Sequence, residues 1–329
     1  MNTDIGLQRR SILTLRDVSV DELRGLLDLA RDLKQRKADG VRGDLLRRRN
    51  IAMLFEKLST RTRCAASVAA ADEGGHAEYL SALEIHLGRK ESVADTARVL
   101  GRMFDGILFR GYRQKTVETL AACSGVPVWN GLTDEAHPTQ AFADLMTIRE
   151  HFGELEGLNV VYVGDGRNNV ANSLMLGCAK LGLSFVNCTP KALCPAAERM
   201  AEARELAAGS GGSVAVEHDP VAAVRGANVI YTDVWVSMGE EAHQAERMRL
   251  LTPYRVDMAM MERTGRLAAG RAVFLHCLPA YHDSETEVSR ETGAQEVTDE
   301  VFNADFSLVF DLAENRMHTI KAMLVATVG

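Results

Sequence analysis

Two guanidinium groups and three hydroxyls occur together in the segment Ser59-Thr60-Arg61-Thr62-Arg63. A short apolar run, Ile51 to Phe55, precedes the segment and an Ala-rich helical pattern follows it, so the five residues are expected at the start of a helix. Helix N-termini carry partial positive charge, and an arginine is unfavourable there by roughly 0.3–1 kcal/mol unless an anion is bound. Backbone N–H groups, hydroxyls and arginine together suit a dianion, so the segment predicts a site for a phosphate or phosphate ester.

Two further segments at predicted helix starts also carry arginine, namely Asp165-Gly166-Arg167-Asn168-Asn169 and Glu314-Asn315-Arg316. For any one of these positions, an arginine that is solvated or paired with a nearby acid is an equally good explanation. Three such positions in one chain favour a small anionic ligand. Arg110 follows the predicted strand 106–109 and can reach the same anion, because ligands of open α/β sheets bind at the carboxyl ends of the strands.

Three more polar segments follow strands or begin helices. His137-Pro138-Thr139-Gln140 has proline at the first helical position, and its imidazole and amide suit a polar carbonyl group beside the phosphate; a capped helix with an incidental histidine is the alternative. Asp233 follows a strand that ends near Tyr231, where an acid suits a ligand ammonium group. His276-Cys277-Leu278-Pro279 ends another strand and brings a thiol to the same kind of edge, although a buried and inert cysteine is the usual case.

Several other kinds of site are excluded by spacing. Gly164 to Asn169 begins like a dinucleotide-binding fingerprint, but Asn169 replaces the third glycine and the acid expected about 20 residues further on is absent. No GxxxxGK[ST] segment occurs, which excludes the phosphate loop of nucleotide hydrolases. The spacing of His276, Cys277 and His282 matches no standard zinc site, so no metal is expected.

The elements that position these residues indicate an α/β fold. A capping box from Ser19 to Glu22 begins the first helix, which ends near Gly40. Apolar runs after the first strand predict further strands at 106–109, 126–129, 158–163, 183–186, 228–231 and 272–275. Because these runs alternate with helical patterns, we expect parallel β-sheets flanked by helices.

The length of 329 residues favours about two domains, at roughly 150 residues per domain. A periodic helix from Pro138 stops near His151, and a glycine-punctuated connection follows. We therefore expect one domain over 1–151 and a second over 152–313, joined by interdomain helices. The last helix, within 314–329, is expected to pack back on the first domain.

Composition limits the partners and the compartment. With 38 Lys+Arg against 45 Asp+Glu, the net charge is −7, which argues against a general polyanion surface and hence against nucleic acid. Six cysteines without a CxxC pair favour a reduced, cytoplasmic setting. No apolar run approaches the length of a membrane span. Any anion site must therefore be local.

In order and spacing, the motifs resemble those of the aspartate/ornithine carbamoyltransferase family over nearly the whole chain. Phe55 to Arg63 is similar to the family's carbamoyl-phosphate signature, and His137 to Gln140 is similar to its second phosphate-side motif. Three later segments are similar to signatures of the members that use ornithine: Asp233-x-x-x-Ser237-Met238-Gly239, His276-Cys277-Leu278-Pro279 and Glu314-Asn315-Arg316-Met317-His318.

The resemblance implies an enzyme that transfers the carbamoyl group of carbamoyl phosphate to the δ-amine of L-ornithine, giving L-citrulline and phosphate in arginine biosynthesis, without a cofactor. Arg110, His137 and Cys277 are the implied catalytic residues. The residues that match the carbamoyl-phosphate site are Ser59, Thr60, Arg61, Thr62, His86, Arg110, His137, Gln140, Cys277, Leu278 and Arg316. Those that match the ornithine site are Asn169, Asp233, Ser237 and Met238.

The resemblance also implies a homotrimer, or a multiple of trimers, in which loop 81–90 reaches a neighbouring subunit's site. In that loop, His86 stands where the family usually has Gln and Arg89 where it often has His, which points to an altered sensitivity to inhibitors. Three alternatives stay open: a carbamoyltransferase for another diamine or amino acid, an inhibitor-resistant form, and a non-catalytic binding subunit. The residues do not distinguish which direction the reaction takes in the cell.

Overall fold

The computed structural model describes residues 3–236 and 243–329. The chain forms two compact units. Unit 1 comprises Met1–Met146 and Glu314–Gly329, and unit 2 comprises Thr147–Ala313. Two helices contain residues of both units.

These two continuous helices are α5 (Pro138–Phe152) and α13 (Val309–Val328). The start of α13 corrects a prediction, because the sequence analysis placed the beginning of this helix at Glu314. The helical pattern extends further toward the N-terminus, with Val309 and Leu312 buried. Arg316 consequently lies inside the helix, where backbone N–H groups are bonded to the preceding turn.

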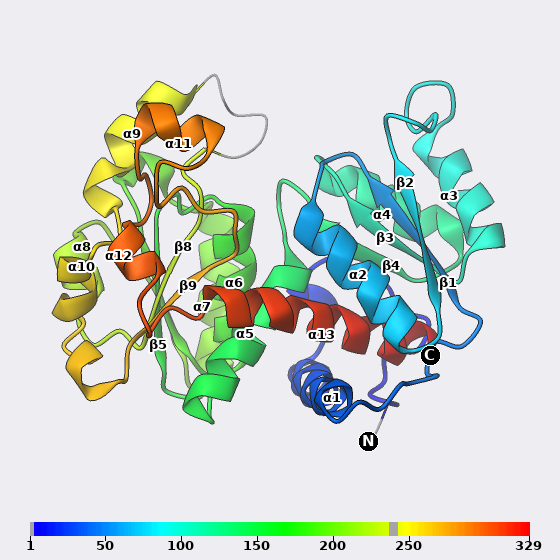
Figure 1. The fold of residues 1–329 in the computed structure, drawn as a ribbon, viewed down its shortest axis with the longest axis horizontal. Coiled ribbons are helices and arrows are strands. Elements are labelled where there is room, and N and C mark those ends of the chain that lie inside the picture. Colours follow the sequence, from blue (N-terminus) through cyan, green and yellow to red (C-terminus); the bar gives the residue numbers. More distant parts are fainter. Residues whose placement is uncertain (1–2, 237–242) are drawn as a thin grey trace. The chain divides into compact units, whose positions relative to one another are not determined.

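Unit 1 contains a parallel sheet with the strand order β2-β1-β3-β4 (Figure 1). Its strands are β1 (Asn50–Phe55), β2 (His76–Ser81), β3 (Gly106–Arg110) and β4 (Val128–Leu132). Its further helices are α1 (Val20–Ala38), α2 (Thr60–Asp72), α3 (Val93–Met103) and α4 (Gln114–Ser124). The predicted capping box of α1 is confirmed, since Ser19 and Glu22 exchange side-chain to backbone hydrogen bonds.

Helices cover both faces of this sheet. One apolar cluster joins the sheet to α3 and α4 through Ala52, Leu54, Ala97, Leu100, Ile107, Phe109, Val117 and Leu120. On the other face, the Ser67 hydroxyl of α2 lies 3.9 Å from the sulfur of Met53, and Trp129 Nε1 donates to Thr327 Oγ1 of α13 at 3.1 Å. The part of α13 from Glu314 onward therefore packs within unit 1.

Unit 2 contains a second parallel sheet with the order β7-β6-β5-β8-β9. Its strands are β5 (Asn159–Val163), β6 (Ser184–Cys188), β7 (Ser213–Glu217), β8 (Val229–Thr232) and β9 (Val273–His276). Its helices include α6 (Asn169–Lys180), α7 (Ala197–Ser210), α8 (Pro220–Ala223), α9 (Gln244–Leu251), α10 (Met258–Arg263), α11 (Glu287–Thr292) and α12 (Asp299–Phe302). Figure 1 shows α8 and α10 on one side of the sheet and α6 on the other.

The predicted α/β class, with two parallel sheets flanked by helices, is confirmed. Two strands were missed, β2 and β7, and each is one of the two edge strands of its sheet; the other edge strands, β4 and β9, were predicted. Each has exposed residues at alternate positions, His76 and Glu78 in β2 and Ser213 and Ala215 in β7, whereas the residues of β4 and β9 are nearly all buried. Only strands that are buried on both faces read as continuous apolar runs, so these edge strands lack the signal that revealed the others.

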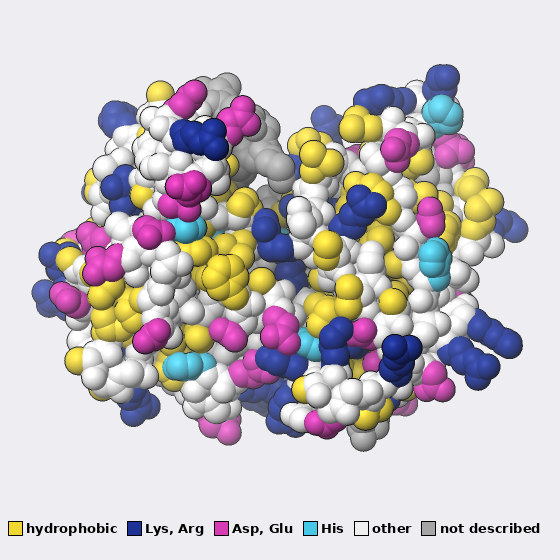
Figure 2. All heavy atoms as spheres, viewed as in Figure 1, with side chains coloured by type: hydrophobic (Ala, Val, Ile, Leu, Met, Phe, Trp, Pro, Cys, Tyr) yellow, Lys and Arg dark blue, Asp and Glu magenta, His cyan; other side chains and the backbone are white. Residues whose placement is uncertain are grey.

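The surface agrees with the charge balance of the sequence. On the face shown in Figure 2, acidic and basic side chains are interspersed. Among the described helices, none combines the length and the apolar character that crossing a membrane requires.

Candidate active site

The first turn of α2, in unit 1, has the features that the sequence analysis expected of an anion site. Ser59 is the N-cap residue, and its hydroxyl accepts a hydrogen bond from the Thr62 backbone N–H at 3.1 Å. The first turn contains no acidic residue. The first backbone N–H groups of a helix have no partner within it, so Thr60 and Arg61 begin a helix whose positive end lacks the usual acidic complement.

Two arginines from distant parts of the sequence meet at the Thr62 hydroxyl. Arg316 Nη2 donates to Thr62 Oγ1 at 2.5 Å, and Arg110 Nη1 donates to the same oxygen at 3.4 Å. The two nitrogens are therefore at most about 5.9 Å apart, the sum of these distances. All three residues are buried. Two like charges this close are unfavourable, and a bound anion relieves the repulsion.

Arg316 reaches this cluster from the interior of α13, not from a helix start as the sequence analysis argued. Its side chain is 3% exposed and also contacts His137. Arg110 is the last residue of β3, at the carboxyl end of the strand, where it was expected. Arg110 thus belongs to a strand end and Arg316 to the interior of a helix. Of the three arginines, only Arg61 lies at a helix start.

His137 lies beside the arginines. Its Nε2 is 3.0 Å from Arg316 Nη2, and its Nδ1 is 3.3 Å from Thr139 Oγ1. Because arginine only donates, Nε2 accepts from Arg316 and the ring proton lies on Nδ1. Burial, followed by the positive charges of Arg316, Arg110 and Arg61, holds the pKa of His137 well below its usual value. The imidazole is therefore neutral at physiological pH.

Gln140 offers an amide in the first turn of α5. Its Nε2 donates to Asp144 Oδ1 at 2.9 Å, which fixes the orientation of the amide. Its Oε1 is buried and accepts no hydrogen bond from the described residues. A buried amide oxygen without a donor is unfavourable, so this atom suits a ligand N–H group.

Three polar residues that the sequence analysis missed fix the turn that leads to His137. Asn130 Nδ2 donates to the carbonyl of Leu13 at 2.9 Å, and its Oδ1 accepts from the Leu132 backbone at 2.9 Å. The Thr133 hydroxyl donates to Gln114 Oε1 at 2.6 Å. Polar residues at a strand end give no specific signal in a sequence, because their partners come from separate elements.

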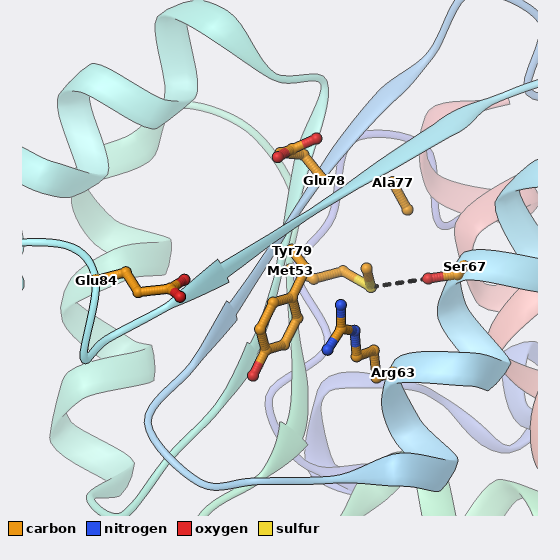
Figure 3. A pocket seen from close by; sticks show the side chains of 7 residues that line it. All are labelled: Met53, Arg63, Ser67, Ala77, Glu78, Tyr79 and Glu84. Carbon is orange, nitrogen blue, oxygen red and sulfur yellow. Dashed lines mark hydrogen bonds between the residues drawn. The ribbon is translucent and has the colours of Figure 1, made fainter.

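Arg63 is the second arginine of the segment Ser59 to Arg63. It does not lie with Arg110, His137 and Arg316 around the Thr62 hydroxyl. Its guanidinium lies over the ring of Tyr79, 3.9 Å from the centroid. Figure 3 shows it beside Tyr79 and Met53, in a cavity that Glu78 and Glu84 also line. Successive residues of a helix are about 100° apart around its axis, so Arg63 faces a different side of α2 from Thr62.

The second arginine segment, Asp165 to Asn169, is neutralised by its own acid. Arg167 Nε donates to Asp165 Oδ1 at 3.1 Å, and Arg247 also forms an ion pair with Asp165. The simpler explanation, an arginine paired with a nearby acid, therefore describes Arg167. Asn169 is the first residue of α6, and Asn168 is its N-cap.

His86 lies on a turn after β2 and is exposed, as are Arg89 and Lys90. Its backbone carbonyl accepts hydrogen bonds from the backbone N–H groups of Arg89 and Lys90, at 3.0 and 3.2 Å. Within the described chain, the His86 side chain forms no hydrogen bond with the Thr62 cluster. A role at the same subunit's phosphate site gains no support from this placement.

In unit 2, Asp233 is the centre of a hydrogen-bonded group. The Cys277 thiol donates to its Oδ1 at 3.0 Å, and Asn168 Nδ2 donates to its Oδ2 at 3.0 Å. Asp233 follows β8 and Cys277 follows β9, so both lie at the carboxyl ends of neighbouring strands. Asn168 was not among the predicted residues, although an asparagine before a helix is a recognisable N-cap.

A buried pair holds the segment that carries Cys277 and Leu278. His276 Nε2 lies 3.2 Å from Glu296 Oε1, and both side chains are completely buried. His276 Nδ1 accepts from the Leu278 backbone N–H at 2.8 Å, and Glu296 Oε1 accepts from the Tyr281 N–H at 2.8 Å. The Leu278–Pro279 peptide bond is cis. Glu296 was missed because its partners are at least 15 residues away in the sequence.

Asp233, His276 and Cys277 each present one possible metal-ligand atom within 4.8 Å of the others. Both nitrogens of His276 already face partners, the Leu278 N–H and the Glu296 carboxylate. A metal would have to displace one of these contacts, so this set fits a metal poorly.

The predicted residues thus form two groups, each within its own unit. Unit 1 brings Thr62, Arg110, His137 and Arg316 together, with Arg61 close enough to act on the pKa of His137. Unit 2 brings Asp233 and Cys277 together. Ser237 and Met238 lie outside the described residues. The first group can bind a dianion and polarise a carbonyl, and the second can bind an amine.

Two family models match the chain. The model for the carbamoyl-phosphate-binding domain of aspartate/ornithine carbamoyltransferases matches residues 10–150. The model for the aspartate/ornithine-binding domain of the same family matches residues 156–327. Together they cover nearly the whole chain.

Similar curated proteins and solved structures carry related names. The chain is 53% identical over 335 residues to a catabolic ornithine carbamoyltransferase of Bacillus licheniformis, covering 100% of this chain and 99% of that protein. It is 55% identical over 329 residues to one of Bacillus cereus, covering 98% and 97%. The ornithine carbamoyltransferase structure from Pyrococcus furiosus has 45% identity, a TM-score of 0.89 and 98% coverage of both chains. An anabolic one from Campylobacter jejuni has 35% identity, a TM-score of 0.85, and covers 96% of this chain and 97% of that one.

Proposed function

The chain belongs to the aspartate/ornithine carbamoyltransferase family and, within it, to the ornithine carbamoyltransferases, and on this premise we propose that it carbamoylates the δ-amine of L-ornithine. The products are L-citrulline and phosphate. The observation that carries the proposal is the buried convergence of Arg110 and Arg316 on Thr62, with neutral His137 beside them. Such a cluster needs a dianion, and carbamoyl phosphate supplies one.

The residues of unit 1 divide between the two ends of carbamoyl phosphate. The first turn of α2 and the guanidinium groups of Arg61 and Arg316 bind the phosphate, through backbone N–H groups and charge-assisted hydrogen bonds. Arg110 and Thr62 polarise the carbamoyl oxygen as it gains negative charge in the tetrahedral intermediate. The buried Oε1 of Gln140 accepts a hydrogen bond from the carbamoyl NH₂ group.

His137 changes its hydrogen bonding when the dianion binds. In the ligand-free protein its Nε2 accepts from Arg316, so it offers no proton there. Because a bound phosphate neutralises the arginines, it raises the pKa of His137 and releases Arg316 to the ligand. Nε2 can then carry a proton and donate to the carbamoyl oxygen.

Unit 2 provides for the two amines of ornithine differently. A carboxylate stabilises an ammonium and therefore opposes loss of its proton, so Asp233 suits the α-ammonium, which stays charged. The δ-amine must attack as the neutral form, which is only on the order of 0.1% of a lysine-like amine at pH 7.4. We place Cys277 beside the δ-amine, where it orients this minor form. The ornithine contacts of Asn169, Ser237 and Met238 rest on the family resemblance.

The chemical step forms a C–N bond and breaks the C–O bond to phosphate. The neutral δ-amine attacks the carbamoyl carbon, and the intermediate expels phosphate. The departing phosphate takes the amine proton, so no separate general base is required. Arg61 and Arg316 stabilise the departing group.

The direction and the assembly are part of the proposal. Two of the similar proteins are named catabolic, which favours citrulline breakdown in the cell over the arginine biosynthesis expected from the sequence. We also propose a homotrimer whose loop 81–90 approaches a neighbouring subunit's phosphate site. The exposure of His86, Arg89 and Lys90 supports this arrangement.

An amine panel tests the function. The full chain is assayed with saturating carbamoyl phosphate and L-ornithine, L-lysine or putrescine, and the ureido product is quantified. L-Ornithine should be the preferred acceptor by at least about a hundredfold in kcat/KM, since putrescine keeps the same spacing of its two nitrogens but lacks the α-carboxyl group, and L-lysine is one methylene longer. Equal use of putrescine contradicts recognition of the α-carboxyl group, and the absence of any ureido product contradicts the transferase itself.

A further inference from the structure

Three parallel strands of unit 2 lie side by side in the order β5-β8-β9 (Figure 1). The segment after β5 leads to Asn168 at the start of α6, Asp233 follows β8, and Cys277 follows β9. Because the carboxyl ends of parallel strands lie at one edge of a sheet, these three side chains meet there. The proposed mechanism uses Asp233 and Cys277, and it gives Asn168 no part.

The Asp233 carboxylate accepts hydrogen bonds on both of its oxygens. Its Oδ1 accepts from the Val234 backbone N–H at 2.8 Å and from the Cys277 thiol at 3.0 Å. Its Oδ2 accepts from Asn168 Nδ2 at 3.0 Å. A carboxylate has about four acceptor positions, two on each oxygen. The donors among the described residues therefore fill Oδ1 and leave one position on Oδ2.

The remaining position on Oδ2 is the one that a ligand ammonium group can use. Asp233 is 7% exposed, so water does not compete freely for this position. Asn168 donates to the same oxygen, and a rotation of the carboxylate would break this hydrogen bond. The amide of Asn168 therefore determines in which direction Oδ2 offers its remaining lone pair.

The Asn168 amide is itself fixed at both ends. Asn168 is the N-cap residue of α6, and its Oδ1 accepts from the Val170 backbone N–H at 2.7 Å. With the oxygen on this N–H group, the amide nitrogen faces Asp233; a reversed amide would place oxygen against the carboxylate. Serine or aspartate caps a helix as well as asparagine does. Capping alone therefore does not require an amide here, whereas the hydrogen bond to Asp233 does.

We infer that Asn168 is a positioning residue for the amine substrate, because its amide orients the Asp233 carboxylate so that Oδ2 is presented to the α-ammonium group. The inference rests on the proposed function for the identity of this ammonium. It does not depend on the transfer step, since a ligand with the α-ammonium but no δ-amine meets the same two side chains. Asn168 acts through Asp233 and needs no contact with the substrate.

The substitution Asn168→Ser tests the inference, because serine keeps the helix cap and has no amide to donate to Asp233. The KM for L-ornithine should rise at least about tenfold, while the KM for carbamoyl phosphate stays within about twofold. L-Norvaline, which is ornithine without its δ-amine, should lose affinity by a similar factor in calorimetric titration with carbamoyl phosphate present. The matched control is Asn303→Ser, which removes an exposed amide–carboxylate hydrogen bond to Asp299 (2.8 Å) and should change each constant less than about twofold.

A double-mutant cycle separates positioning from a purely structural role. In the Asp233→Asn background, Asn168→Ser should raise the KM for L-ornithine by less than about threefold, since the carboxylate that it orients is gone. An equal effect in both backgrounds overturns the inference, and so does an unchanged KM for L-ornithine in Asn168→Ser alone. A wild type that forms no citrulline contradicts the proposed function instead, and the norvaline titration then still tests Asn168. If the wild type does not bind norvaline, the inference fails as well.

Discussion

Replacing Arg316 with methionine separates the guanidinium's effect on ligand binding from its effect on folding. Methionine replaces the apolar stem of arginine without its guanidinium group and suits a position that is only 3% exposed. Without ligand, the substitution removes the repulsion from Arg110, whose nitrogen lies at most about 5.9 Å away. Unit charges at that distance repel by about 3 kcal/mol at an effective dielectric constant of 20.

The same substitution leaves His137 Nε2 without its donor and Thr62 Oγ1 with only the longer hydrogen bond from Arg110, and an unsatisfied buried acceptor costs about 1–3 kcal/mol. Gain and loss are similar in size, so we expect the free energy of unfolding to change by no more than about 2 kcal/mol. With the dianion bound, Arg316 supplies two charge-assisted hydrogen bonds of about 1.5–3 kcal/mol each. Their loss lowers kcat/KM for carbamoyl phosphate by about a hundredfold to ten-thousandfold.

The assay combines citrulline formation at varied carbamoyl phosphate with urea unfolding of the same preparations. The control is Arg98→Met, which removes an exposed arginine of α3 that pairs with Asp95 at 2.7 Å, and it should change kcat/KM less than about twofold. If Arg316→Met keeps kcat/KM within tenfold of the wild type, the phosphate assignment is refuted. A loss of activity that only follows a large loss of folding stability refutes it equally.

Three further predictions follow from the remaining geometry. Asp233→Asn should raise the KM for ornithine at least about tenfold and leave the KM for carbamoyl phosphate nearly unchanged, as steady-state kinetics will measure. Cys277→Ser keeps a donor to Asp233, so the fold should persist while kcat falls about tenfold to a hundredfold; an unchanged kcat removes Cys277 from the mechanism. Burial lowers the pKa of His318 to about 4, below that of an unfolded histidine, so the unfolded chain binds its proton first and stability falls as the pH drops from about 6.5 to 4. His318→Gln should flatten the loss between pH 7 and pH 5 in urea unfolding, and an unchanged pH dependence argues against the lowered pKa.

The buried parts of the fold could be predicted because their sequence signals are local. Central strands such as β5 and β8 are continuous apolar runs, and the capping box at Ser19 is a contiguous pattern. The edge strands β2 and β7 could not be identified this way, since neither is buried throughout: two of the six residues of β2 and two of the five residues of β7 are exposed. The predicted start of α13 was five residues too late, because the prediction followed the motif at Glu314 and overlooked the buried Val309.

In the candidate site, sequence patterns predicted the positions of some side chains along their elements but not the directions in which others point. The positions of Arg110 and His137 could be anticipated from strand and helix ends, and the structure brings them together with Thr62 and Arg316. Arg63 stands two residues from Arg61, yet its side chain lies over Tyr79, because residues on one helix point in different directions.

Contacts made by residues far apart in the sequence were beyond prediction. Glu296 orients the segment after β9 from a position with no motif of its own, and Asn168 holds Asp233 across 65 residues. A sequence shows which side chains are present, but only the folded chain shows which of them contact one another.

The central claim is that this protein transfers the carbamoyl group of carbamoyl phosphate to the δ-amine of L-ornithine. Its most direct test follows the carbon, using carbamoyl phosphate labelled with ¹³C at the carbonyl together with L-ornithine and the purified full chain. The account predicts that the label appears in the ureido carbon of citrulline, with one phosphate released per citrulline formed. Phosphate released without labelled citrulline, or label found in another product, contradicts it.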